Sequence, residues 1–246
     1  MQTATPQTAI ITGASKGIGK ATAFLLGSNH IDVVVNYNQD AAGARDAVQA
    51  IEKQGGRAIA VQADVRVPAG VTHLFDAAID AFGRVDILIN NAGVLLTKPI
   101  ADITEADFDT VFAVNVKGVF FAMKEAATRL ADNGRVINLS STTTRALFPN
   151  YGLYSASKAA VEQATRVFAK EMGPRGITVN AVMPGPTNTQ LMRDGKTDAD
   201  RERLAGLAAL NRLGEPEDVA RVILFLVSEQ AGWVSAQVLG VNGGFI

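Results

Sequence analysis

The sequence predicts an α/β fold in which one doubly wound, mostly parallel sheet of seven strands carries helices on both faces. Short apolar runs alternate with segments of helical periodicity along the whole chain. These runs are continuously apolar rather than alternating, which is typical of strands covered on both faces. The chain has 246 residues, 48% of them hydrophobic, and no linker or repeat divides it. We therefore expect residues 1–246 to form a single domain.

Seven segments have the character of buried strands, because they are short, apolar and mostly followed by glycine or polar residues. Strands are expected at residues 8–12, 31–37, 58–62, 86–89, 135–139, 178–182 and 238–241.

The segments between these strands carry apolar residues at helical spacing, and some have recognisable starts. Thr104 is a candidate N-cap with Asp107 completing a capping box, and Pro216 suits a first helical turn. Residues 187–213 are polar and irregular, and we expect a mobile, partly helical substrate loop there. Helices are expected at residues 19–26, 41–54, 69–82, 104–130, 151–172 and 216–228.

Composition excludes several classes of function. The formal net charge is −1 without a basic block, so no nucleic-acid surface is expected. There are no cysteines, which excludes disulfides, thiolate metal sites and a cysteine nucleophile. His30 and His73 lie far from the motifs below, so no metal site is expected. With no signal peptide and no run long enough to span a membrane, a cytoplasmic protein is expected.

A glycine-rich loop lies between the first strand and the first helix. Gly13, Gly17 and Gly19 follow residues 8–12, with Ser15 and Ile18 between them. Glycines there let the backbone approach a pyrophosphate, and the start of a helix favours its negative charge. A simple glycine turn is the alternative interpretation.

The end of the second strand bears on the choice of dinucleotide. An acid there would bind the ribose hydroxyls of NAD and repel a 2′-phosphate, but Asn38 stands there and Asp40 is the first acid. Lys16 in the glycine loop can reach the same place, unless it is an ordinary surface charge. We therefore expect NADP(H) in preference to NAD(H). Asp64 and Val65, after the third strand, either hold the adenine ring or form a capped turn.

Tyr154 and Lys158 lie four residues apart within the helix expected at residues 151–172, and therefore share one face. An ammonium group beside a phenol favours the phenolate and lowers its pKa, so Tyr154 is a candidate acid/base. An ordinary exposed helix pair would have the same spacing.

These features stand in a family-like order with other short motifs. The glycine loop is preceded by Thr12, and residues 90–93 read Asn-Asn-Ala-Gly. The set continues with Asn115, Ser141, Tyr154, Lys158 and the Pro-Gly pair at residues 184–185. Together they resemble the classical short-chain dehydrogenase/reductase family over nearly the whole chain. Residues 212–218 and 243–244 also resemble its 3-oxoacyl-[acyl-carrier-protein] reductase and glucose dehydrogenase members.

The resemblance implies a Rossmann domain with particular residue roles. Tyr154 would be the acid/base, and Lys158 would lower its pKa and bind the nicotinamide ribose. Ser141, with Ser140 as the adjacent alternative, would bond the substrate oxygen, and Asn115 would hold a water linking Lys158 to solvent. Further cofactor contacts would come from Asn91, Ala92, Gly93, Pro184, Gly185, Thr187 and Thr189.

Relatives of this kind form homotetramers, which implies the same assembly here. The predicted helix at residues 104–130 offers apolar side chains to a partner, and Trp233 is expected in the core or at a subunit interface. The side chains in question are Phe112, Val116, Val119, Phe120 and Met123.

The loops that follow the strands predict an apolar pocket and a moderately hydrophobic ketone or secondary alcohol as substrate. The alternatives are a 3-oxoacyl-[acyl-carrier-protein] reductase, for which Arg129 and Arg175 are candidate docking residues, an epimerase or dehydratase, and a non-catalytic NADP-binding redox sensor. The expected lining residues are Val94, Leu95, Leu96, Leu147, Phe148, Tyr151, Leu191 and Met192.

Overall fold

One seven-stranded sheet, with strand order β3-β2-β1-β4-β5-β6-β7, organises the molecule. The computed structural model describes residues 6–194 and 196–246, and every adjacent pair of strands in the sheet is parallel. The predicted α/β sheet is confirmed, and the ends of its strands differ from expectation by at most two residues. The strands are β1 (Thr8–Ile11), β2 (Asp32–Tyr37), β3 (Ala58–Gln62), β4 (Ile87–Asn90), β5 (Arg135–Leu139), β6 (Thr178–Pro184) and β7 (Val238–Val241).

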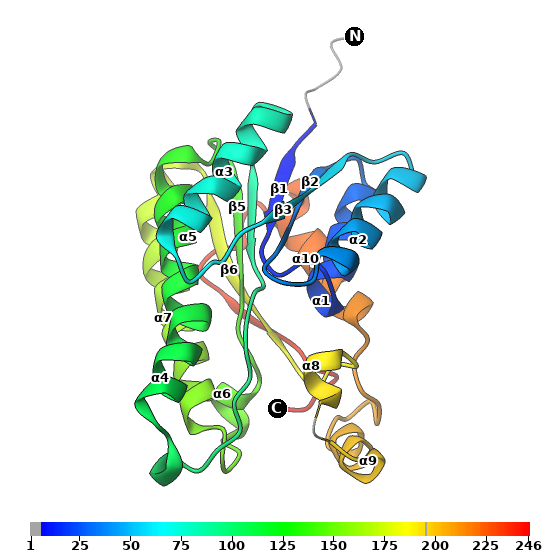
Figure 1. Ribbon diagram of the computed structural model, residues 1–246, viewed down its shortest axis with the longest axis vertical. Helices are drawn as coiled ribbons and strands as arrows, with labels where there is room; N and C mark the ends of the chain where they lie inside the picture. Colours follow the sequence, from blue (N-terminus) through cyan, green and yellow to red (C-terminus); the bar gives the residue numbers. More distant parts are fainter. Residues whose placement is uncertain (1–5, 195) are drawn as a thin grey trace.

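Helices cover both faces of this sheet, as Figure 1 shows. On one face lie α1 (Gly17–Gly27), α2 (Ala41–Lys53) and α10 (Pro216–Val227). On the other lie α3 (Pro68–Phe82), α4 (Glu105–Phe112), α5 (Gly118–Arg129) and α7 (Gly152–Met172).

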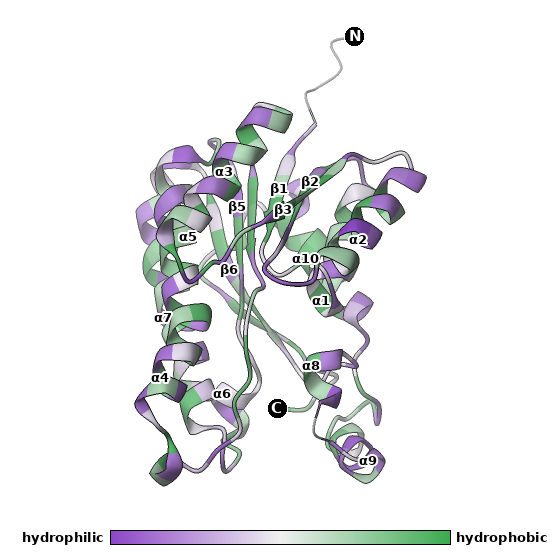
Figure 2. Ribbon diagram, in the orientation of Figure 1, coloured by the Kyte–Doolittle hydropathy of each residue, from purple (hydrophilic) through white to green (hydrophobic). Residues whose placement is uncertain are grey.

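The core has two layers because successive strand residues point to opposite faces. Ile11 of β1 packs with α1 and α10, whereas its neighbour Ile10 packs with α3 and α5. In Figure 2 the hydrophobic colour follows the strands, and the hydrophilic colour lies mainly on the outward sides of the helices.

The carboxyl ends of the parallel strands gather at one edge, at the lower end of Figure 1. The chain order reverses between β1 and β4, and ligands of such sheets bind beside this switch point. The short helices α6 (Thr143–Ala146), α8 (Gln190–Arg193) and α9 (Asp198–Gly206) lie at the same end, as does the carboxyl terminus.

The helix expected at residues 104–130 is interrupted. Its start is as predicted, with Thr104 and Asp107 forming a reciprocal capping box. After α4, however, a π-helical turn spans Ala113–Lys117 before α5 begins. This turn carries Asn115, which is fully buried, so the widened helix brings a polar side chain inside the molecule.

Three expectations about apolar side chains need correction. Val119 and Met123 belong to the core of this chain and are not available to a partner helix. Trp233 is fully exposed, so it does not lie in the core, and a place at a subunit interface stays a prediction. The predicted interface therefore has to rest on other side chains, of which Phe120 is half exposed at 50%.

Other predictions concern the chain as a whole. The single-domain prediction covers residues 1–246, of which residues 1–5 and 195 lie outside the described part. In that described part no helix has the length and apolar character needed to cross a membrane. It also contains no group of three or more histidine or acidic side chains suited to a metal ion.

Candidate active site

The glycine loop after β1 is packed too tightly for larger residues. Gly13 has a φ of +63°, and a Cβ there would lie 2.9 Å from the Cα of Ala92. A Cβ on Gly19 would lie 2.5 Å from the carbonyl oxygen of Gly13. Side chains are thus excluded at both positions, and the loop forms a closely packed turn between β1 and α1.

Polar side chains from the neighbouring strand ends hold this loop. Asn36, buried near the end of β2, accepts a hydrogen bond from the Gly13 amide at 3.0 Å. Asn91 donates to the carbonyl oxygens of Thr12 and Gly13, each at 2.9 Å. The Thr12 hydroxyl accepts from the amides of Asn91 and Ala92, each at 3.0 Å. The positioning role of Asn36 was not predicted. The sequence does contain a sign of it, because Asn36 is a polar residue directly after three valines of a buried strand.

The amino end of α1 is left open for a ligand. The N-cap residue, Lys16, makes no side-chain hydrogen bond to the first turn, so the first backbone amides of α1 have no capping acceptor from it. Ser15 is buried beside them and Ile18 is half-buried. An uncapped helix start behind a glycine loop fits the pyrophosphate of a dinucleotide.

No acid stands at the end of β2 to meet a ribose. Asp40 instead caps α2, accepting from the Gly43 amide at 2.9 Å. That bond holds the pKa of the Asp40 carboxyl below its usual value, and Ser15 and the charges of Lys16 and Lys20 act in the same direction. The acid nearest the glycine loop is therefore already engaged.

The residues beyond β2 and β3 have local partners. The Asn38 carbonyl accepts from Gln62 at 2.8 Å. The carboxylate of Asp64 accepts from the Arg66 amide at 2.9 Å and is also paired with the Arg66 guanidinium. Asp64 therefore forms the capped turn, which was one of the two interpretations of this residue from the sequence. Adenine contacts from Asp64 and Val65 stay a prediction.

The loop after β6 reaches back to the glycine loop. The strand β6 ends at Pro184. The next residue, Gly185, donates a hydrogen bond to the Val241 carbonyl at 3.0 Å. The Thr187 hydroxyl donates to the Gly185 carbonyl at 2.9 Å. Thr189 caps α8, and its methyl group would lie 3.2 Å from a Cβ on Gly17. The two loops thus approach each other at Gly17 and Thr189.

Ser141, Tyr154 and Lys158 meet where β5 ends against the first turns of α7. The buried Lys158 ammonium donates to the Leu139 carbonyl at 2.7 Å and lies 5.9 Å from the centre of the Tyr154 ring. Ser141 is also buried, and its oxygen accepts from the Thr143 hydroxyl at 3.0 Å and the Thr143 amide at 3.3 Å.

Burial dominates the ionisation of both α7 groups. It raises the pKa of Tyr154, with Tyr151 adding to the rise and the Ser141 hydroxyl opposing it. It lowers the pKa of Lys158 from 10.5 to about 8. Burial thus outweighs any lowering of the Tyr154 pKa by Lys158, and the lowering expected from Lys158 stays a prediction. The physical reason is that low polarity penalises both charged forms, while the ammonium is directed at Leu139.

Asn115 joins the loop after β4 to α7 beside this group. Its carbonyl oxygen accepts from the Val94 amide at 2.8 Å, and its amide donates to the Val94 carbonyl at 2.9 Å and to Ser157 at 3.1 Å. A Cβ on Gly93 would lie 3.4 Å from both Asn115 Oδ1 and Lys158 Nζ. Asn115 thus fixes the loop after β4 beside Lys158. The water that it was expected to hold stays a prediction.

A chain of aromatic rings, here called the aromatic row, extends from Tyr154. Its members are Tyr154, Tyr151, Phe148 and Phe245. The ring centres are 6.5 Å apart for Tyr154 and Tyr151, 5.9 Å for Tyr151 and Phe148, and 5.9 Å for Phe148 and Phe245. Phe245 was not predicted, because nothing local in its sequence indicates which loop it packs against.

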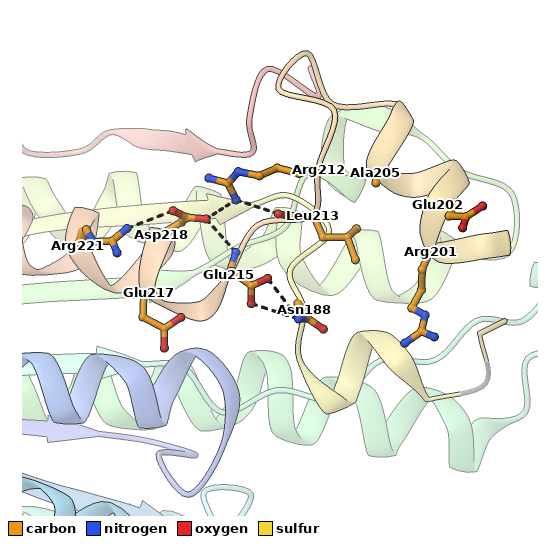
Figure 3. Close-up of a pocket in the computed structure, with 10 residues that line it drawn as sticks. All are labelled: Asn188, Arg201, Glu202, Ala205, Arg212, Leu213, Glu215, Glu217, Asp218 and Arg221. Atoms are coloured by element: carbon orange, nitrogen blue, oxygen red, sulfur yellow. Dashed lines mark hydrogen bonds and ion pairs between the residues drawn. The ribbon is translucent and has the colours of Figure 1, made fainter. Parts of the chain in front are cut away.

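A separate hollow of about 720 Å³ lies at the base of the 187–213 segment and does not include Ser141, Tyr154 or Lys158. Figure 3 shows Arg212 and Arg221 converging on Asp218, at 2.7 and 3.2 Å. It also shows Asn188 facing Glu215, to which it donates at 3.2 Å.

These contacts, with the pairing of Thr187 and Gly214, tie the two ends of the segment together. Most of the described part between those ends is helical, in α8 and α9. The mobility expected of this segment stays a prediction.

The doubly wound sheet and the uncapped helix start behind a glycine loop define a dinucleotide-binding fold, and Ser141, Tyr154 and Lys158 form its candidate catalytic group. The model of the family described as enoyl-(acyl carrier protein) reductase matches residues 13–246. The chain belongs to the short-chain dehydrogenase/reductase family and is an oxidoreductase of that type.

Individual relatives match over nearly their full length. The chain is 44% identical to an NADPH-dependent aldehyde reductase-like protein, chloroplastic, of Arabidopsis thaliana, covering 97% of this chain and 93% of the relative. It is 42% identical to a short-chain type dehydrogenase/reductase of Picea abies, covering 96% and 91%. The crystal structure of the angucycline C-6 ketoreductase LanV with bound NADP superposes with a TM-score of 0.92 at 38% identity, covering 97% and 95%.

Proposed function

We propose that the protein is an NADPH-dependent carbonyl reductase, or alcohol dehydrogenase in the reverse direction, acting on a ketone or secondary alcohol. The observation that carries this proposal is the meeting of Ser141, Tyr154 and Lys158 beside the open crevice of the glycine loop. It is supported by the NADPH dependence in the name of the Arabidopsis relative and by the NADP bound in the LanV structure.

The residues around the crevice suit this cofactor. The backbone of the glycine loop and the uncapped start of α1 would hold the pyrophosphate. The lack of a free acid at the end of β2, with Lys16 nearby, favours a 2′-phosphate over a hydroxyl pair. The proposed cofactor contacts are Gly13, Ser15, Lys16, Gly17, Ile18, Gly19, Asn38, Asp64, Val65, Asn91, Ala92, Gly93, Tyr154, Lys158, Pro184, Gly185, Thr187 and Thr189.

The bound cofactor supplies the hydride that adds to the carbonyl carbon. Negative charge then develops on the carbonyl oxygen, where Ser141 and Tyr154 would donate hydrogen bonds. Because its pKa is raised, Tyr154 is protonated at neutral pH and can give its proton to that oxygen. Lys158 would stabilise the resulting phenolate until solvent returns the proton, so each turnover adds one hydride and one proton.

The surroundings favour an apolar substrate over a carrier-protein thioester. The aromatic row and the apolar loops would form the pocket. Arg129 is engaged by Asp76 at 2.6 Å and Glu125 at 3.1 Å. Arg175 is engaged by Asp132 at 2.7 Å and by the Leu130 carbonyl. Neither candidate docking residue is thus left to attract an acidic carrier protein.

The other two alternatives have less support. A non-catalytic sensor would not need a complete Ser-Tyr-Lys set, whereas Ser141, Tyr154 and Lys158 are all present here. An epimerase or dehydratase that keeps its cofactor bound is disfavoured by the single compact sheet and by the position of Asn115. We also propose a homotetramer in the cytoplasm, as the sequence predicts.

The test is carbonyl-dependent oxidation of NADPH, followed by absorbance, with a panel of ketones, β-ketoesters and acetoacetyl thioesters. Turnover of at least one simple ketone is expected. Absence of turnover with every member of the panel would contradict the proposal, and a preference for the thioester would favour the carrier-protein alternative.

A further inference from the structure

We propose that Glu162 is a positioning residue for Ser141, because its carboxylate anchors the two hydroxyl residues around that serine to the helix that carries Tyr154 and Lys158. This inference rests on the proposed function and adds a residue that acts through Ser141 rather than on the substrate.

Glu162 is a buried acid that the proposed chemistry does not use. It lies on α7 one turn beyond Lys158 and is 7% exposed. One of its oxygens, Oε1, accepts hydrogen bonds from the Ser140 hydroxyl at 2.6 Å and the Thr144 hydroxyl at 2.8 Å. Hydrogen bonds to a carboxylate are shorter and stronger than those between neutral groups, so this anchor is a firm one.

Five consecutive hydroxyl residues, 140–144, lead from β5 into α6 and contact α7. Glu162 holds the first and the last of them. Ser155 of α7 adds a bond to the Thr143 carbonyl at 3.1 Å, and Lys158 bonds Leu139 just before the run. The run is therefore attached to α7 at several points, which fixes Ser141 relative to Tyr154.

The same arrangement orients the proton of Ser141. Since Thr143 donates twice to the Ser141 oxygen, the serine hydrogen is directed elsewhere and is available to a substrate oxygen. Ser140 donates to Glu162, and the Thr144 hydroxyl lies 2.8 Å from Glu162 Oε1 and 3.0 Å from the Ser141 carbonyl, so neither hydroxyl is directed at the Ser141 hydroxyl. This also separates Ser141 from Ser140, whose hydroxyl faces the carboxylate.

A double-mutant cycle distinguishes positioning from a general structural role. We expect Glu162→Leu to lower kcat by about 10- to 100-fold, part of the roughly 10²–10³-fold that the loss of one oxyanion donor costs. The Kd for NADPH should change less than about threefold, because the crevice of the glycine loop is untouched. Glu162→Gln keeps an acceptor oxygen and should retain most activity.

In a Ser141→Ala background, Glu162→Leu should lower kcat by no more than about threefold, because the residue it positions is gone. Glu171→Leu, at an exposed position of the same helix, is the matched control and should leave kcat unchanged. The proposal would be overturned if the fold-losses in kcat of Glu162→Leu and Ser141→Ala multiplied in the double variant. A wild-type kcat in Glu162→Leu would overturn it as well.

Two further variants keep the test decisive if Glu162→Leu does not fold. Ser140→Ala and Thr144→Val each remove one of the two anchors, and each should lower kcat in the wild type but not in Ser141→Ala. An unchanged kcat in both would overturn the inference. Failure of the proposed function looks different, since the wild-type protein itself would then oxidise NADPH with none of the carbonyls.

Discussion

Individual residues at the site are held in ionisation states that suit reduction more than oxidation. Tyr154 keeps its proton because burial raises its pKa, and a protonated phenol is what an incoming hydride requires. The pKa of Lys158 is lowered to about 8, so its ammonium group is charged at lower pH and loses its proton at higher pH. The site therefore combines a stable acid with a cation that titrates close to neutrality.

Tyr154→Phe should lower turnover by orders of magnitude while the protein still binds NADPH through its other contacts. Loss of a general acid costs about 10²–10⁴-fold in rate, whereas the glycine loop and α1 are unaffected by a missing hydroxyl. The measurements are kcat with the best ketone and the Kd for NADPH from fluorescence titration. Near-normal kcat in this variant would refute the assignment of Tyr154.

The pH dependence of reduction should follow Lys158. We expect kcat/KM to be constant below a pH of about 8 and to fall above it, because the ammonium loses its proton there while Tyr154 keeps its own. Lys158→Arg stays charged, so its decline should move to higher pH. Lys170→Arg, exposed on the same helix, is the control. The same decline in all three proteins would contradict this prediction.

At the scale of elements, the strands and the capped helix starts were predictable because their signals are local. A continuous apolar run marks a buried strand wherever it occurs, and the capping box of Thr104 is written in four residues. The π-helical turn was not predictable. It accompanies bonds between Asn115 and Val94, 21 residues earlier, which no helical periodicity reveals.

The aromatic row predicts a preference for aromatic substrates. Edge-to-face ring contacts are worth about 0.5–1.5 kcal/mol beyond burial, so an aromatic ketone should gain over a saturated one of the same skeleton. We expect 2-tetralone to be preferred to 2-decalone in kcat/KM, and Phe245→Leu to reduce that ratio by about three- to tenfold. Phe24→Leu, exposed on α1, should not change it. An equal ratio in wild type and Phe245→Leu would contradict this prediction.

For the whole molecule, the location of the candidate site was predictable from the sequence. The residues that position its loops and side chains were not. A parallel sheet brings all carboxyl strand ends to one edge, so motifs far apart in sequence had to meet there. Asn36, Glu162 and Phe245 escaped prediction because each acts through a partner on another segment. Asn36 holds a glycine 23 residues away, and Glu162 a serine 22 residues away.

Assembly can be tested on exposed aromatic side chains. Phe108 and Phe120 are 46% and 50% exposed on neighbouring helices, and Trp233 is fully exposed, which is unusual unless a partner covers them. We expect a solution mass about four times 25.8 kDa and blue-shifted Trp233 emission. Phe120→Asp should lower the mass, and Phe24→Asp should not. A monomeric wild-type protein would contradict the predicted tetramer.

The closed base of the 187–213 segment has a consequence for how such an enzyme can change. Thr187 pairs with Gly214 and Asn188 with Glu215, so the ends meet whatever lies between them. Once ends are fixed, doubling the length of a loop costs only about 0.6 kcal/mol. We therefore expect changes of length or sequence between these joined ends to alter the substrate contacts of the segment while the strands of the sheet keep their register.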